Sequence, residues 1–507
     1  MKHFFFLCTF LFFILMLVKI ARQSKPVKLP PGPKPLPIIG NIHQLIGSVP
    51  HKILADLGRK HGPLMYLKFG EVPTVIISSA EVAKQFFTNY DLIFASRAYL
   101  LSASILNYNC TDIGFAPFGD YWRQLRKICT MELLSPRRVQ SFRSIREKEV
   151  LNMIKSIALQ EGSAVNLSKK ISSVTYSITS LAAFGKGSKY HAKFMLVSDE
   201  ALKLLGGFSI ADMYPSVKVL ERITGIRKKL EKVHKQVDEV LENILSEHKV
   251  KRAVPKRGSG EEAKDQDLVD VLLKVQSSGE FGAQLTDNNL KAVIFDMFTG
   301  GGETSSTTAE WAIAEMINNP RVMKRAQDEV RRIFGEIGTV DESRIRDLTY
   351  LQAAIKETLR LHPPATLLPA RECSERCEIY GYEIPVKTRV IVNVWAIGRD
   401  PHYWTDPEKF NPERFLDSQT DFRGTDFNYI PFGAGRRICP GISFALPNIE
   451  LPLAQLLYHF DWKLPGAAVK QEQLDMSETF GLTTGRTQDL ELLPIPYHPF
   501  SNNSAAC

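Results

Sequence analysis

Residues 431–441 read PFGAGRRICPG, and in this stretch one cysteine, Cys439, stands among three glycines. Gly433, Gly435 and Gly441 carry no side chain, so the backbone can come close to another group. The residues that follow are typical of a helix, which puts Cys439 directly before a helix N-terminus. The dipole of that helix would stabilise a thiolate. The stretch therefore predicts a cysteine thiolate that faces a bound group.

Haem iron is a suitable partner for such a thiolate, because a cysteine can serve as its axial ligand. Arg437 would then supply a cation for a haem propionate. A second interpretation is a glycine-rich turn before a helix, with a buried and inert cysteine. The stretch by itself leaves both interpretations open.

A second glycine run, MFTGGGETSSTT at residues 297–308, lies between two flanks that show helical apolar spacing. Each glycine costs a helix interior about 1 kcal/mol relative to alanine. One interpretation is a loop that joins two helices. The other is one long helix that opens locally, so that a bound group can lie against its backbone.

Five motifs resemble, in their order along the chain, those of the cytochrome P450 superfamily. They are WxxxR at 122–126, the oxygen-binding motif (A/G)Gx(D/E)T(T/S) at 300–305, ExxR at 357–360, PERF within 410–415 and FxxGxRxCxG at 432–441. The resemblance covers essentially the whole chain. It implies a mainly α fold with small peripheral β-sheets in one large domain. It also implies haem b with an axial cysteine thiolate, and dioxygen as co-substrate.

The resemblance also implies roles for individual residues. Cys439 is expected to be the sole protein ligand of the haem iron, and Thr304 and Glu303 are expected to deliver protons during catalysis. Gly302 stands where plant members of the family usually have threonine. Further haem contacts are expected at Trp122, Arg126, Gly301, Arg371, Phe432, Arg437 and Gly441. A buried structural network is expected from Glu357, Arg360 and Arg414.

An apolar substrate pocket is expected, because the topology of the family brings five stretches around the distal side of the haem. Its predicted wall is Leu106, Leu205, Phe208, Val293, Ile294, Met297, Ala365, Leu367, Leu368, Phe480 and Leu482. Such a pocket would hold a hydrocarbon by shape and buried area, at about 25 cal/mol per Å².

The net charge of +9 belongs mainly to the N-terminus, because six basic residues and no acidic ones lie in the first 34 residues. Without those six the net charge falls to +3, which argues against a nucleic-acid partner. The seven cysteines are odd in number and include no CxxC pair. This cysteine usage favours a reducing compartment over a disulfide framework.

The apolar run FFFLCTFLFFILMLV at 4–18 predicts an uncleaved, single-pass membrane anchor. The flank that follows the run is more basic than the flank before it, which predicts that the rest of the chain lies in the cytosol. The expected location is the endoplasmic-reticulum membrane. A cleaved signal peptide is the alternative, but no small-x-small cleavage site follows the run. The predicted organisation is an anchor at 1–28, a proline-rich hinge at 29–37, a catalytic haem domain at 38–500 and a tail at 501–507.

The pattern along the body predicts a small hairpin at 63–79 and mainly helical structure from 81 to about 362. A second small sheet is predicted at 377–398. A last helix is predicted at about 442–460, and a strand-rich tail follows it.

Several longer stretches, among them GDYWRQLRKIC at 119–129 and VNVWAIGRDP at 392–401, resemble plant microsomal members of family 71, most of all its subfamily D. The resemblance implies a monooxygenase that hydroxylates or epoxidises a hydrophobic plant metabolite. The chain has no GxGxxG after a strand, so electrons from NADPH are expected to come through a membrane-bound NADPH–cytochrome reductase.

A terpenoid, namely a sesquiterpene or diterpene, is the favoured substrate. The alternative substrates are an alkaloid or a flavonoid. The alternative functions are those of a haem-thiolate isomerase or dehydratase and of a non-catalytic haem-binding membrane protein.

Overall fold

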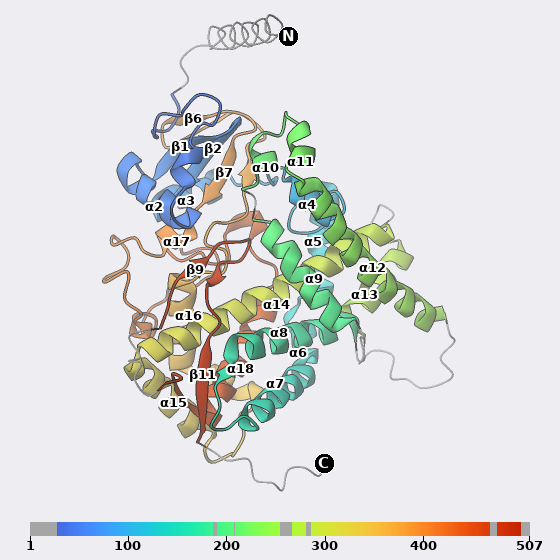
Figure 1. The fold of residues 1–507 in the computed structure, drawn as a ribbon, viewed down its shortest axis with the longest axis vertical. Helices are drawn as coiled ribbons and strands as arrows, with labels where there is room; N and C mark the ends of the chain where they lie inside the picture. Colours follow the sequence, from blue (N-terminus) through green and yellow to red (C-terminus); the bar gives the residue numbers. More distant parts are fainter. Residues whose placement is uncertain are drawn as a thin grey trace, which may run out of the picture.

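The computed structural model describes residues 28–185, 190–206, 208–253, 266–279, 285–466 and 474–497. Figure 1 shows a mainly helical body with small sheets at its edges, which confirms the predicted fold class. The predicted anchor, up to residue 27, and the predicted tail at 501–507 lie outside the described residues. Within the described ranges, no helix combines the length and the apolar character needed to cross a membrane.

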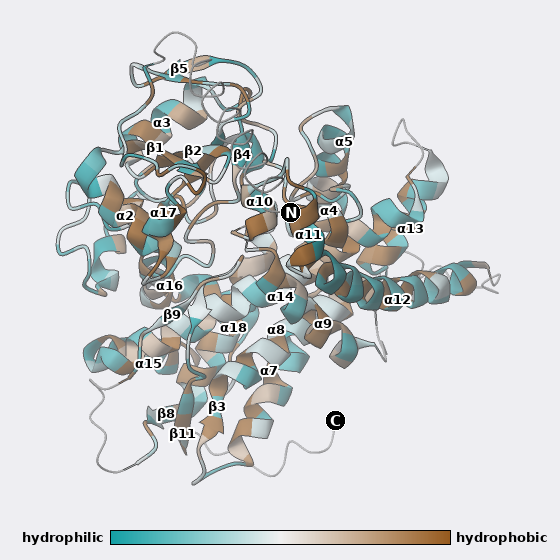
Figure 2. Cartoon of the chain, turned by 45° about the horizontal axis from the view of Figure 1, so that its top comes forward, coloured by the Kyte–Doolittle hydropathy of each residue, from teal (hydrophilic) through white to brown (hydrophobic). Residues whose placement is uncertain are grey.

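The helices of the body arise from amphipathic stretches of sequence. On α12 the buried side chains recur mostly every three or four residues, and the mostly hydrophilic remainder faces outward (Figure 2). The α-helices are α2 (Pro50–His61), α3 (Ala80–Asn89), α4 (Leu101–Leu106), α5 (Asp120–Ile128), α6 (Pro136–Ser141), α7 (Arg143–Ala158), α8 (Leu167–Phe184), α9 (His191–Leu204), α10 (Ile210–Met213), α11 (Val219–Ile223), α12 (Ile226–Ala253), α13 (Leu268–Ser278), α14 (Asp287–Asn318), α15 (Pro320–Phe334), α16 (Thr349–Leu361), α17 (Val394–Ile397) and α18 (Ile442–His459). Shorter 3-10 segments are η1 (Ile42–Leu45), η3 (Glu342–Asp347), η4 (Pro412–Phe415) and η5 (Gly435–Arg437), and η2 (Cys129–Leu133) is a short π-helix.

The glycine run lies within α14, which crosses the centre of the body and packs against α8, α16 and α18 (Figure 1). The run is part of one long helix, but this helix is α-helical throughout, so the local opening expected from the sequence is not present. Gly302 faces the ring of Tyr176 on α8, where a Cβ would lie 2.5 Å from a ring carbon. The close approach of the two helices therefore requires a glycine at this position.

The largest sheet has the strand order β1-β2-β7-β4 and joins distant parts of the chain. β1 and β2 form the predicted antiparallel hairpin, and β7 pairs with β2 in parallel, with Val390 opposite Val75. Figure 1 shows the orange β7 beside the blue hairpin. The strands are β1 (Leu64–Phe69), β2 (Val72–Ile77), β3 (Val165–Asn166), β4 (Arg371–Glu372), β5 (Cys377–Ile379), β6 (Tyr382–Ile384), β7 (Arg389–Val392), β8 (Phe460–Lys463), β9 (Glu478–Thr479), β10 (Gly485–Arg486) and β11 (Glu491–Pro496).

The prediction of a separate second sheet at 377–398 is wrong. Only β5 and β6 form a hairpin of their own, β7 joins the first sheet, and α17 replaces the expected last strand. Local alternation of apolar residues identifies a strand but carries no information about a distant parallel partner.

The last residue of the predicted anchor and the start of the predicted hinge are docked on the body. The carbonyl of Lys28 accepts the N–H of Glu383 at 2.9 Å, and the carbonyl of Pro31 accepts the N–H of Tyr66 at 2.9 Å. Gly32 lies so close to β1 that a Cβ there would be 2.0 Å from the carbonyl oxygen of Tyr66. These residues therefore belong to the edge of the sheet rather than to a free spacer.

A buried ionic network joins α16 to the segment around η4. The Nε of Arg360 donates to Glu357 at 2.7 Å, and the Nε of Arg414 donates to the same carboxylate at 2.9 Å. Glu357 and Arg360 are almost fully buried. Arg360 also donates to the carbonyls of Gly398 and Pro407, so its charge is well satisfied. The three residues named from the ExxR and PERF motifs are thus in direct contact.

Gly302→Ala should destabilise the protein, although alanine is the better helix former by about 1 kcal/mol. Its methyl group would overlap the Tyr176 ring, and overpacking of this kind typically costs about 1–3 kcal/mol. The matched control is Gly300→Ala, because nothing lies within 4 Å of a Cβ at Gly300. Thermal unfolding should separate the two variants. Equal melting temperatures would contradict the assigned role of Gly302.

Candidate active site

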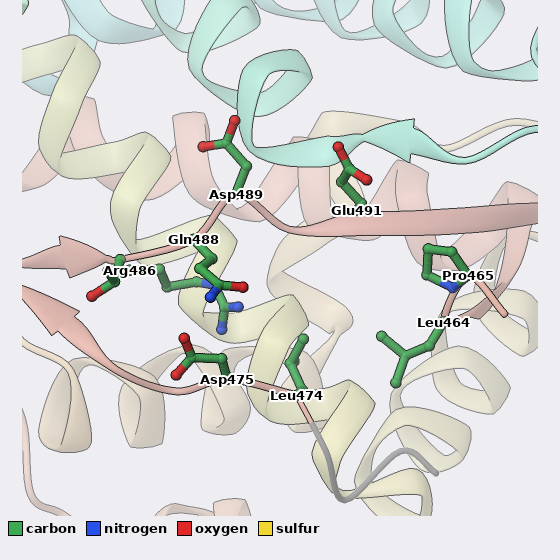
Figure 3. Close-up of a pocket in the computed structure, with 9 residues that line it drawn as sticks. Leu464, Pro465, Leu474, Asp475, Arg486, Gln488, Asp489 and Glu491 are labelled. Carbon is green, nitrogen blue, oxygen red and sulfur yellow. The ribbon is translucent and has the colours of Figure 1, made fainter. Parts of the chain in front are cut away.

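Two hollows differ in their chemistry. One, of about 580 Å³, lies among the C-terminal strands and is lined by Asp475, Asp489 and Glu491 among others (Figure 3). It contains none of the predicted site residues. Another, of about 320 Å³, lies between α14 and the cysteine stretch and is lined by Cys439 and Thr304 among others. The second hollow is the candidate active site, and we refer to it as the cavity.

The cysteine stretch wraps one side of the cavity. The backbone N–H of Cys439 donates to the carbonyl of Phe432 at 3.0 Å, which closes the loop. Gly433 and Gly435 have φ of 75° and 67°, which side chains disfavour. The N–H of Gly441 donates to Cys439 Sγ at 3.4 Å. Burial raises the pKa of the Cys439 thiol, and the Gly441 N–H and the charge of Arg126 oppose that rise.

Asp91, which the sequence analysis missed, holds this loop in place. Its carboxylate accepts Arg371 Nη1 at 2.6 Å, and it accepts both the backbone N–H and the side chain of Arg436 at 3.0 Å. Burial opposes its ionisation, but the Arg436 N–H and the charge of Arg371 outweigh burial and lower the pKa of Asp91. A Cβ at Gly435 would lie 2.4 Å from the same carboxylate. Gly435 is therefore required by a contact as well as by its backbone conformation.

Four arginines line the cavity: Arg97, Arg126, Arg371 and Arg437. Of these, only Arg371 has a carboxylate within ion-pair distance among the described residues. Arg97 donates to the carbonyls of Gly114 and Pro369, Arg126 to that of Ile438, and Arg437 to that of Ala95. Burial, together with the charge of Arg371, lowers the pKa of Arg437 to about 9.

Cations held only by carbonyl groups in a cavity call for an anionic ligand, because burying an uncompensated charge is costly. A dianion such as haem with its two propionates fits this need. The cysteine loop offers the sulfur, and the open side of Gly300 leaves room for a flat ring.

The structure brings together most of the predicted haem contacts, with two differences. Arg126, Gly301, Arg371, Phe432, Arg437 and Gly441 all line the cavity. Trp122 stands behind the cavity wall, where its indole N–H donates to the carbonyl of Ile113 at 3.0 Å and its ring packs under Arg437. Arg371 is bound to Asp91, so its charge is already compensated.

Arg97 lines the cavity but was not among the predicted contacts. Arg97 ends the stretch FASR at 94–97, directly after apolar residues. An arginine next to a stretch that is expected to be buried needs a hydrogen-bonding or charged partner, and this was the signal in the sequence.

The two predicted catalytic residues of α14 point to different sides. Thr304 lines the cavity, and its hydroxyl donates to the carbonyl of Gly300 at 2.7 Å. Glu303 lies one residue earlier and turns away toward α8, where it accepts the hydroxyl of Tyr176 at 3.2 Å. Burial raises the pKa of Glu303. Thr304 and Glu303 are therefore on different faces of α14, because adjacent residues on a helix point in different directions.

The predicted substrate wall is only partly present. Met297, Ala365, Leu368 and Leu482 line the cavity. Seven other predicted residues lie outside its lining. Leu106, Leu205, Val293 and Ile294 are buried in the core around α14, Phe208 and Leu367 pack against the core beside β1 and β2, and the ring of Phe480 contacts those of Phe208 and His51. The stretches on α14, at 364–368 and near residue 482 reach the cavity as predicted, whereas those around Leu106 and around Leu205 and Phe208 do not, because tertiary packing buries them in the core.

The wall is also less apolar than predicted. Asp296, Thr299 and Thr483 line it beside the four arginines. Asp296 and Thr299 belong to α14, and residues three or four apart on a helix share a face. The rotation that brings Gly300 to the cavity therefore brings Asp296 to it as well, and polar groups enter a wall that was expected to hold only hydrocarbon side chains.

A cysteine sulfur, surrounding cations and a long helix across the cavity form the arrangement that haem-thiolate proteins use to hold a haem. The chain belongs to the cytochrome P450 family, whose model matches residues 30–488. It is a cytochrome P450 monooxygenase.

Similar proteins come from plants. Tabersonine 16-hydroxylase 2 of Catharanthus roseus is 54% identical over 500 residues, which cover 98% of either chain. Tabersonine 6,7-epoxidase isoform 1 of the same plant is 54% identical over 486 residues, covering 94% of this chain and 95% of that protein. Cytochrome P450 71D10 of Glycine max is 55% identical over 495 residues, covering 97% and 96%. The resemblance to plant family 71 is thereby confirmed.

A solved structure of a zebra fish cytochrome P450 with abiraterone has a TM-score of 0.75 at 24% identity. The match covers 89% of this chain and 100% of that chain, and it shows the same fold.

Asp91→Asn should weaken both the fold and haem retention. The amide keeps the shape but loses the charge that Arg371 needs, and breaking a buried ion pair typically costs about 3–5 kcal/mol. The control is Asp120→Asn, an exposed residue paired with Arg123, for which a change of about 0–1 kcal/mol is expected. Thermal unfolding and the haem content per chain measure the effect. An Asp91→Asn protein with full haem content and an unchanged melting temperature would contradict the role of Asp91.

Proposed function

We propose that this monooxygenase hydroxylates or epoxidises a hydrophobic, polycyclic plant metabolite, with Cys439 as the only protein ligand of haem iron. The observation that carries the proposal is the placement of the Cys439 sulfur in a cavity beside Arg97, Arg126 and Arg437, which lack carboxylate partners among the described residues. When bound, haem with a thiolate ligand supplies the activation of dioxygen and the cleavage of its O–O bond.

The chain's own residues would orient the cofactor and exclude water from it. Arg97, Arg126 and Arg437 would bind the propionates, and the Gly441 N–H would hold the sulfur by a hydrogen bond. Asp91 would hold the loop against β4 through Arg371 and Arg436. On the opposite wall, Gly300 leaves space for the small co-substrate, because no neighbouring atom lies within 4 Å of its Cβ position.

Thr304 is the proposed proton-handling group of the wall. Its hydroxyl donates to the Gly300 carbonyl in this structure and can turn toward the cavity, since the carbonyl is held by the helix in any case. Glu303 is proposed only as a more distant proton reservoir. Its contact with Tyr176 supports that lesser role.

An alkaloid of the tabersonine type is the first substrate candidate. Two relatives at 54% identity are named for a hydroxylation and an epoxidation of tabersonine. A rigid polycyclic molecule also suits a wall of Met297, Ala365, Leu368 and Leu482. The same apolar residues support a terpenoid as the second candidate.

The remaining proposals concern the setting of the enzyme. Electrons would come from an NADPH–cytochrome reductase, and residues 1–28 would anchor the chain in the endoplasmic-reticulum membrane with the haem domain at 38–500 in the cytosol. The proline-rich stretch at 29–37 would link the two, although its first residues are docked on β1.

Cys439→Ser should abolish the thiolate band of the reduced, carbon-monoxide-bound spectrum and the monooxygenase activity, because serine is a poor replacement for a thiolate on iron. Cys129→Ser is the matched control, since Cys129 is buried in the core and does not line the cavity. Retention of the band in Cys439→Ser would overturn the assignment of the ligand.

Turnover with reductase, NADPH and a panel of tabersonine, sesquiterpenes and diterpenes should identify the substrate class. The adjacent residues Leu368 and Leu367 then test the wall. Leu368→Ala should redistribute products among neighbouring carbons by about fivefold or more, since pocket changes of about 1–3 kcal/mol are typical of one side-chain group. Leu367→Ala should not, because Leu367 packs against the core. Equal product ratios in both variants would contradict the assigned wall.

A further inference from the structure

The loop at 107–115 is held against α14 by a carboxyl group that the reaction does not use. Asp296 Oδ2 accepts the backbone N–H groups of Ile113 at 2.9 Å and Gly114 at 3.0 Å. Its Oδ1 accepts Asn107 Nδ2 at 3.2 Å. Asp296 faces the cavity on one side, but its oxygens are already occupied by the loop. It is therefore poorly suited to bind a substrate directly.

A second buried carboxyl group stands beside the first. Asp112 accepts Asn107 Nδ2 at 2.6 Å and the backbone N–H of Phe115 at 3.1 Å. Asn107 Nδ2 thus donates to both carboxyl groups, which holds them side by side. A Cβ at Gly114 would lie 3.4 Å from Asp112 Oδ2 and 3.6 Å from Asp296 Oδ2. The two carboxyl groups thus flank the same point of the loop.

Two ionised carboxylates held side by side away from solvent repel each other, so the pair favours a state in which one of them is protonated. We propose that Asp112 and Asp296 hold one proton between them and, with Asn107, form a latch that positions the loop at 107–115. Ile113, Gly114 and Phe115 line the cavity, so the latch sets the shape of this wall. Both carboxyl groups are positioning residues. The effect on substrate choice rests on the proposed function, whereas the latch itself does not.

The charges around the pair favour this arrangement. Arg97 and Arg437 attract Asp112 and favour its ionised form. The other titratable neighbours are Cys110, Cys129 and Tyr121, and burial raises the pKa of each, to about 12 for the two thiols. They stay neutral near pH 7. The proton is therefore assigned to Asp296, the partner farther from the arginines' influence.

The pKa values agree with the geometry. Burial raises the pKa of Asp112 to about 6, and burial and the charge of Asp112 raise that of Asp296 well above its usual range. A carboxyl group whose pKa is raised in the folded state stabilises that state at low pH and loses this contribution as pH rises through the folded pKa. At alkaline pH both groups become charged, they repel each other, and the loop should loosen.

Hydrogen exchange of the haem-loaded protein tests the latch without any substrate. In Asp296→Ala, exchange of the peptide covering 107–115 should be at least about tenfold faster than in the wild type at pH 7. In Asp296→Asn it should stay within about threefold, because the amide donates to Asp112 and its oxygen accepts the N–H groups of Ile113 and Gly114. At about pH 9.5 the wild-type loop should exchange faster than the Asp296→Asn loop. The expected difference between the two variants arises because Asp296→Ala loses the hydrogen bonds to the loop, whereas Asp296→Asn keeps them.

Glu310→Gln is the control, because Glu310 is a largely buried acid on the same helix that contacts Ser168 and not the loop. It should leave exchange at 107–115 unchanged. Equal exchange in Asp296→Ala and the wild type would overturn the latch. If the loop in Asp296→Asn exchanges as fast as the loop in Asp296→Ala at pH 7, the proposal of a shared proton is overturned. The thiolate spectrum of each variant shows that the fold is kept, so failure here is distinct from failure of the proposed function.

Discussion

The ion pair between Asp91 and Arg371 is the contact on which the site depends. Cys439 lies in a loop whose glycines make it adaptable, so the loop has no fixed position by itself. Asp91 holds it through Arg436 and by contact with Gly435, and Arg371 fastens the same carboxylate to β4 in the large sheet. The cysteine loop and the sheet therefore meet at one buried carboxylate, which helps to fix the position of the sulfur.

Charge compensation around the cavity is incomplete within the part of the chain that the structure describes. Arg371 has its own carboxylate, whereas Arg97, Arg126 and Arg437 have only carbonyl partners there. Completing this arrangement with an anionic cofactor would stabilise the fold by mass action as well as enable the chemistry. Asp112 lies near enough to influence two of these arginines. A bound anion and the Asp112 carboxylate would therefore act on the same two arginines.

The three glycines of α14 serve different purposes. Gly300 leaves the cavity open, while Gly301 lies near Phe444 and Thr179, and Gly302 admits the Tyr176 ring. The same rotation of the helix sends Thr304 to the cavity and Glu303 to α8. One uninterrupted helix therefore forms the cavity wall and also packs tightly against α8. Close contacts account for Gly301 and Gly302, whereas Gly300 faces open space.

The sequence determined the family, the mainly helical fold and the residues of the cysteine loop and the Glu357 network, because these depend on motifs with fixed local spacing. It also identified three of the stretches around the cavity, on α14, at 364–368 and near residue 482. Only the tertiary structure decided that β7 joins the first sheet, that Asp91 holds the cysteine loop, and that Leu106 and Val293 pack the core while Leu368 faces the cavity. The physical reason is that each of these features depends on segments far apart in the chain, which local periodicity does not encode. Such segments supply the partner of a strand, the counter-ion of a buried charge and the surface against which a side chain packs.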